Sequence, residues 1–141
     1  MERLALVIAL AAAAVTIAWL VQRRRPDPPS SPPEFSVPTQ LDRADFPRPE
    51  APWLVALFSS STCEGCASMW TAIEPLTSDE VATVDIEVRA REDLHTRYAV
   101  GAVPTTVLAD AEGVVRASVI GPVPATELWS TVAAVRDESA D

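Results

Sequence analysis

The sequence predicts an α/β protein of three layers, preceded by one N-terminal transmembrane helix. Segments with strand and helix periodicity follow one another in the order strand, helix, strand, helix, hairpin, helix. Ahead of them lies Leu4 to Val21, a run of 18 residues without a charge. At 141 residues the chain has room for this segment and for one modest domain.

The uncharged run is long enough to cross a membrane. As a helix its 18 residues span about 27 Å, close to the roughly 30 Å of a hydrocarbon core. Trp19 suits the membrane interface. A cleaved signal peptide and a buried core helix are the alternatives, but three arginines, Arg23 to Arg25, follow where a cleavage site would need small polar residues. We therefore expect a retained anchor.

The arginines also predict the orientation of this anchor. Only Arg3, offset by Glu2, and the amino terminus precede the span, whereas three arginines follow it. The positive-inside rule then places the rest of the chain in the cytoplasm. A dithiol in that compartment is expected to work as a reductant, because the cytosol keeps thiols reduced.

Three parts are expected along the chain. Residues 1–25 form the anchor with its arginine flank, residues 26–50 a proline-rich linker and edge segment, and residues 51–141 the globular domain. The net charge is −9, and all 11 basic residues are arginines. Such an acidic chain is not expected to bind nucleic acid.

The domain is organised around the segment from Trp53 to Trp70. Its apolar start, Trp53 to Phe58, is typical of a strand buried on both faces. Ser59 to Thr62 suit a turn into a helix, and Cys63-Glu64-Gly65-Cys66 follows. A thiol at a helix start has its thiolate stabilised by the helix dipole, so Cys63 is the expected nucleophile. Cys66, one turn on and more buried, is expected to resolve the mixed disulfide.

Other uses of the two cysteines fit less well. A structural disulfide across so small a loop removes little unfolded-state entropy. A closed zinc site needs four ligands, whereas the chain has two cysteines and one histidine, His95. We expect no metal and no bound cofactor.

The remaining elements follow from periodicity and turn residues. Val81 to Val88 reads as a strand, and Glu92 to Val100 as a short helix ended by Gly101. Thr105 to Leu108 and Val114 to Ile120 are expected to pair around an Asp-x-x-Gly turn. A last helix opens at Pro124 and Thr126, with an apolar stripe of Leu128, Trp129, Val132 and Val135. His95 is expected at the surface, and Trp53, Trp70 and Trp129 in the core.

With these motifs in order, Pro52 to Val135 resembles the thioredoxin superfamily, in particular membrane-anchored bacterial thioredoxin-like proteins. The resemblance includes Tyr98 to Thr106, YAVGAVPTT, after the C-x-x-C unit. It implies a thioredoxin-like three-layer sandwich and a thiol–disulfide oxidoreductase. It also implies that Pro104 is a cis-proline opposite the dithiol, and that Thr62, Val103 and Pro104 contact substrate. An ordinary trans proline at a strand start is the alternative.

The sequence departs from the family at the site itself. The reductases of the family usually have Gly-Pro between the cysteines, where this chain has Glu64-Gly65. The buried acid that many thioredoxins have six residues before the first cysteine is Leu57 here, and the aromatic before that cysteine is Thr62. Without the acid we expect no internal base for Cys66.

The function predicted from these observations is that of a membrane-anchored protein disulfide reductase. Its partners would be a protein disulfide substrate, an external electron donor such as a thioredoxin reductase, and the membrane through residues 4–21. Two alternatives stay open. One is a thioredoxin-like protein facing outward in envelope disulfide or cytochrome maturation, and the other is a redox-inert binding module on the same fold.

Overall fold

The structure is a computed structural model that describes residues 35–139. The predicted transmembrane helix at Leu4 to Val21 and the first part of the proline-rich linker lie outside the described residues. Within residues 35–139, no helix has the length and hydropathy needed to cross a bilayer.

A mixed four-stranded sheet forms the middle layer, in the order β2-β1-β3-β4. β1 runs parallel to β2 and antiparallel to β3, and β3 and β4 form an antiparallel hairpin. The strands are β1 (Trp53–Ser59), β2 (Val81–Glu87), β3 (Thr105–Ala109) and β4 (Val115–Ile120). The helices are α2 (Glu64–Ile73), α3 (Glu92–Arg97) and α4 (Ala125–Glu138), with short 3-10 turns η1 (Arg43–Asp45) and η2 (Glu74–Leu76).

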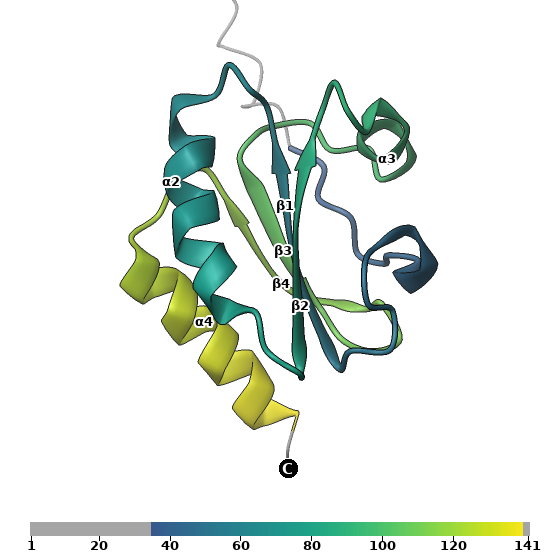
Figure 1. The fold of residues 1–141 in the computed structure, drawn as a ribbon, viewed down its shortest axis with the longest axis vertical. Coiled ribbons are helices and arrows are strands. Elements are labelled where there is room, and N and C mark those ends of the chain that lie inside the picture. The colour runs from purple at the N-terminus through teal and green to yellow at the C-terminus, as the bar shows by residue number, and fades with distance from the viewer. Residues whose placement is uncertain (1–34, 140–141) are drawn as a thin grey trace, which may run out of the picture. The chain divides into compact units, whose positions relative to one another are not determined.

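Helices cover both faces of this sheet, so the fold has the three layers that the sequence predicts (Figure 1). α2 and α4 lie on one face, and α3 lies on the other together with the segment around η1. The sequence of the central strand β1 is continuously apolar because both of its faces are covered. Leu54, Ala56 and Phe58 pack into the core on the α3 side, whereas Val55 and Leu57 pack under α2 and α4.

The second half of the linker region packs against the domain. Leu41 and Phe46 are buried in the core on the α3 side, and Gln40 makes an isolated bridge to Val114 beside β4. The buried Arg43 side chain donates hydrogen bonds to the carbonyl oxygens of Asp110 (2.7 Å) and Ala51 (3.0 Å). These contacts make residues 37–51 part of the domain.

Three details differ from the sequence-based expectations. α3 ends at Arg97, and the left-handed residue that follows it is Ala99 (φ 50°) instead of Gly101. His95 is buried, because α3 folds back on the sheet and its Nε2 lies 2.8 Å from the Ile86 carbonyl oxygen. Trp129 is 43% exposed, although its Nε1 donates a hydrogen bond to the Ala72 carbonyl in α2.

One buried hydroxyl gives a stability prediction. Thr106 is 3% exposed, and among the described residues its Oγ1 has no hydrogen-bond partner. Thr106→Val keeps the shape and removes the unpaired group, so we expect the free energy of unfolding to rise by about 1–2 kcal/mol. Denaturant unfolding of the full chain measures this change.

The neighbouring threonine supplies the matched control. Thr105 is equally buried, but its Oγ1 donates to the Ala102 carbonyl at 2.8 Å. Thr105→Val should therefore lower the stability by about 1 kcal/mol. Equal effects of the two substitutions would contradict the assignment of Thr106 as the unpaired group.

Candidate active site

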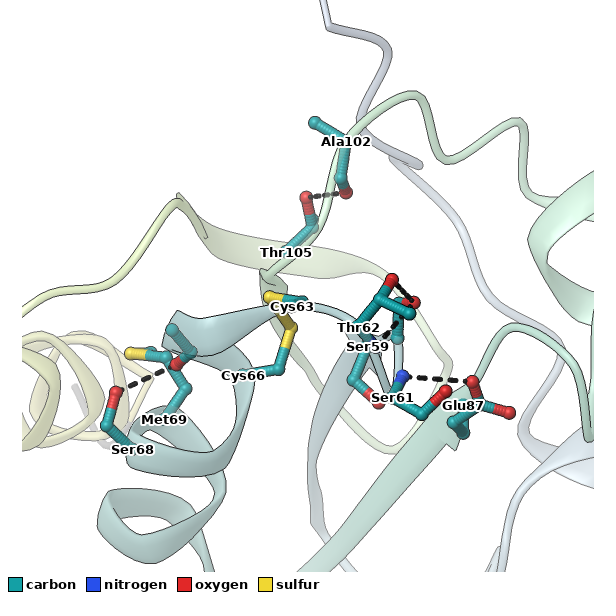
Figure 2. Close-up of a disulfide and its surroundings, with 12 residues drawn as sticks. Ser59, Ser61, Thr62, Cys63, Cys66, Ser68, Met69, Glu87, Ala102 and Thr105 are labelled. Atoms are coloured by element: carbon teal, nitrogen blue, oxygen red, sulfur yellow. Dashed lines mark hydrogen bonds between the residues drawn. A yellow bond between two sulfur atoms is a disulfide. The ribbon is translucent and has the colours of Figure 1, made fainter.

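The two cysteines lie where β1 passes into α2, and they form a disulfide with each other (Figure 2). Cys63 is the N-cap residue of α2 and is half-buried, whereas Cys66, one turn into the helix, is 5% exposed. The Cys66 N–H donates to the Cys63 carbonyl at 3.3 Å, which starts the helix. The unpaired N–H groups and the positive end of the α2 dipole therefore face Cys63.

The residues that the sequence assigns to substrate contact lie in two loops. Thr62 is exposed in the turn before Cys63, and its Oγ1 lies 3.0 Å from Ser60 Oγ. Val103 is 36% exposed, whereas Pro104 is buried, and the peptide bond between them is cis. The Pro104 carbonyl accepts a hydrogen bond from Gly121 N–H (2.8 Å), which ties this loop to the end of β4.

The dipeptide between the cysteines meets a neighbouring loop. A Cβ atom built on Gly65 would lie 3.1 Å from the Cβ of Pro122, which is closer than side chains normally approach. Gly65 therefore lets α2 begin directly against the loop that leads into α4. Glu64, beside it, is an exposed acid in the first turn of α2, where the helix dipole favours a negative charge.

A cavity of about 420 Å³ opens on the β2 side of the disulfide. Both cysteines line it, together with Trp70 on α2, and Asp85 and Glu87 on β2. Asp85 and Glu87 are acidic, and no basic side chain is among the residues that line the cavity. The site is thus a disulfide beside a pocket with an acidic wall.

Glu87 holds the loop that carries the dithiol (Figure 2). Its Oε1 accepts a hydrogen bond from Ser61 N–H at 3.1 Å, and its Oε2 accepts from the N–H groups of Arg89 (2.9 Å) and Ala90 (3.0 Å). These backbone hydrogen bonds, that of Ser61 first, lower the pKa of Glu87 from its ordinary value of 4.5. One carboxylate therefore joins the loop before Cys63 to the loop after β2.

The lowered pKa predicts how stability changes with pH. The contribution of Glu87 is complete above its unfolded-state pKa, near 4.5, and is lost as the pH falls through the lower folded-state pKa. Glu87→Gln should therefore unfold more easily than the parent chain at neutral pH, and the gap should close in acid. Thermal unfolding of both proteins across this range measures the gap; a gap that does not change with pH would contradict this role.

Sequence reasoning missed three residues of this site: Glu87, Ser59 and Asp85. All three line the cavity, and Ser59 Oγ donates to Asp85 Oδ1 at 2.5 Å. Asp85 occupies a polar position in the alternating pattern of its strand. An ordinary solvated surface acid would give the same pattern. Only the register between β1 and β2 brings it beside the cysteines. Within residues 35–139, no group of three or more His, Cys, Asp or Glu side chains is placed to hold a metal ion.

Fold and site together define a thioredoxin-like redox protein: a mixed sheet between helices, with a C-x-x-C disulfide at the start of α2. Solved structures support this class. A mutant thioredoxin from Halobacterium salinarum matches with a TM-score of 0.56 and 24% identity over 75% of this chain and 95% of that one. Deadhead, the germline-specific thioredoxin of Drosophila melanogaster, matches with a TM-score of 0.53 and 25% identity over 60% and 82%.

A third thioredoxin, from Malassezia sympodialis, matches with a TM-score of 0.50 and 21% identity over 57% of this chain and 72% of that one. No protein-family model matches the sequence, and no curated protein sequence does either. The three-dimensional similarity establishes the fold. That fold is thioredoxin-like.

Proposed function

We propose that this protein is a membrane-anchored thiol–disulfide oxidoreductase of the protein disulfide reductase type. The observation that carries the proposal is the Cys63–Cys66 disulfide at the N-terminus of α2, beside an open cavity. The helix start favours a thiolate at Cys63, and the cavity gives a second disulfide room to approach.

The exchange has two steps. The Cys63 thiolate attacks one sulfur of a substrate disulfide, which forms a mixed disulfide and releases the other substrate sulfur as a thiolate. Cys66 then loses its proton and attacks Cys63 Sγ, which forms the Cys63–Cys66 disulfide and releases the second substrate sulfur as a thiolate. Two electrons pass from the dithiol to the substrate, and an external donor such as a thioredoxin reductase would restore the dithiol.

The substrate would bind across Cys63 and the loop around Val103. Val103 is exposed at this loop, and Thr62 is exposed in the turn directly before Cys63. These positions leave the Val103 backbone and the Thr62 side chain available to an extended segment of a substrate protein.

The anchor and its orientation complete the proposal. Residues 4–21 would hold the domain at the cell membrane, with the three arginines after the span keeping it on the cytoplasmic side. A topology reporter fused after Asp141, with labelling of Cys63 in intact cells by a membrane-impermeant reagent, tests this. Labelling from outside would overturn the cytoplasmic placement and favour a role in envelope maturation.

Turnover tests the activity itself. The full chain, purified in detergent, is mixed with insulin and dithiothreitol, and the precipitation of the reduced insulin B chain is followed. We expect a rate well above that of dithiothreitol alone. If the protein adds nothing to that rate and Cys63 titrates like a free thiol, the binding-module alternative is correct. That alternative draws support from Leu57 and Glu64, where the chain departs from the family's reductases.

A further inference from the structure

The residue next to Leu57 on the neighbouring strand is an acid. In the parallel pairing of β1 and β2, Leu57 is in register with Asp85. Register partners in adjacent strands point to the same face of a sheet, with the strands about 4.8 Å apart. Leu57 packs under α2, in the core that contains Met69. Asp85 therefore projects from the α2 face of the sheet, one strand away from the position where many thioredoxins carry their buried acid.

Ser59 holds this acid at the cavity that the two cysteines also line. Ser59 is 3% exposed, lies two residues after Leu57 on the same face of β1, and donates from Oγ to Asp85 Oδ1. The hydrogen bond occupies one of the two carboxylate oxygens. Ser59, Asp85 and Cys66 line the same cavity. A carboxylate and the buried cysteine thus share one solvent-accessible space.

The charges around this space single out Asp85. Glu87 also lines the cavity, but both of its oxygens are bound to backbone N–H groups. Glu64 is exposed in the first turn of α2, next to Cys63, and is not among the residues that line the cavity. Asp85 is solvent-exposed and is the lining carboxylate that is held by a single hydroxyl; among the described residues its second oxygen has no hydrogen-bond partner.

We propose that Asp85, positioned by Ser59, accepts the proton of Cys66 in the resolving step. The Cys66 S–H bond breaks as the proton passes to Asp85, directly or through solvent in the cavity. The Cys66 sulfur then attacks Cys63 Sγ, the Cys63–Cys66 bond forms, and the substrate sulfur leaves with the electron pair of the bond to Cys63. Asp85 returns the proton to solvent. This inference rests on the proposed function, because it assigns a residue to the second step of that exchange.

A double-mixing experiment isolates this step. The reduced full chain reacts with one equivalent of dithiobis(nitrobenzoate); Cys63 displaces one thionitrobenzoate, and Cys66 then displaces the other from Cys63. The rate of the second release reports the resolving step alone. For Asp85→Asn we expect that rate to fall at least about tenfold near neutral pH. The difference should shrink as the pH rises, because hydroxide then removes the thiol proton without a protein base.

The sign of the effect separates this role from a purely electrostatic one. If Asp85 acted only as a negative charge, its removal would favour the Cys66 thiolate and speed the second release. Asp85→Glu should restore part of the rate, and Ser59→Ala should slow the step by less than Asp85→Asn does. Asp79→Asn, which removes an exposed acid in the loop before β2, is the matched charge control and should behave like the parent chain.

Each outcome decides between the alternatives. A second release in Asp85→Asn as fast as in the parent at neutral pH, or one slowed equally at every pH, overturns the inference. If Asp85→Asn fails to fold, as judged by circular dichroism, Ser59→Ala carries the same test by its pH profile. A parent chain that resolves the adduct but does not reduce insulin would refute the proposed function, whereas the second-release rates alone decide whether Asp85 acts on Cys66.

Discussion

Replacing Cys63 by serine is expected to abolish disulfide exchange, with a loss of rate of at least about a thousandfold. Cys63 is the half-buried sulfur at the N-cap of α2, whereas Cys66 is buried behind it. A serine hydroxyl at this position cannot supply a thiolate, and the remaining thiol is not accessible to a protein disulfide. Insulin reduction with dithiothreitol as donor measures the loss.

The complementary substitution gives the control. Cys66→Ser retains the nucleophile but removes the resolving thiol, so the mixed disulfide between Cys63 and the substrate should accumulate. Mass spectrometry under non-reducing conditions detects that adduct. If Cys63→Ser formed the adduct and Cys66→Ser did not, the two cysteines would have the opposite roles.

The second large effect is expected at Gly113, in the turn between β3 and β4. Gly113 has φ +80°, and a Cβ atom built there would lie 2.0 Å from the Leu41 carbonyl oxygen. The Gly113 carbonyl also accepts the Leu41 N–H at 2.8 Å. Gly113→Ala combines left-handed strain with a clash against backbone, so we expect it to cost about 2–5 kcal/mol of folding free energy. Denaturant unfolding followed by tryptophan fluorescence measures the cost.

Gly121 is the matched control for this prediction. It has φ +85°, but a Cβ atom built there meets nothing within 4 Å. Gly121→Ala should therefore cost only the left-handed strain, about 1–2 kcal/mol. Equal costs at the two positions would show that the segment around Leu41 is not held against this turn.

Much of the fold follows from local sequence patterns. The continuous apolar run at Trp53 to Phe58 predicts a strand covered on both faces, and β1 is buried between two layers. The Asp-x-x-Gly turn predicts the hairpin, because Asp110 Oδ1 accepts the N–H groups of Glu112 and Val114 and Gly113 takes the left-handed conformation. Local hydrogen bonding and periodicity are sufficient to define these elements.

Features that depend on tertiary packing could not be predicted in this way. His95 has the same polar neighbours in sequence as a surface residue, but the fold of α3 against β2 buries it beside Phe58. Trp129 lies on the apolar stripe of α4, yet the helix packs on α2 so that Leu128 is buried and Trp129 is largely exposed. Both outcomes depend on how a helix is oriented on its neighbour.

The candidate site, too, could be predicted from local sequence patterns only in part. The positions of Cys63 and Cys66 at a helix start follow from the turn residues and the C-x-x-C spacing. The position of Asp85 does not follow from such patterns. It lines the cavity with the cysteines because of the register of β2 against β1, which no pattern within either strand specifies. For this reason the sequence alone predicts no internal base for Cys66.

The central claim is that the Cys63–Cys66 pair exchanges two electrons with a protein disulfide. The most direct measurement mixes the fully reduced chain with excess insulin, without any other reductant, and then alkylates and maps all free thiols by mass spectrometry. We expect one insulin disulfide to be lost for each Cys63–Cys66 disulfide formed. If the insulin disulfides remain intact while both cysteines stay fully alkylated, the claim is contradicted.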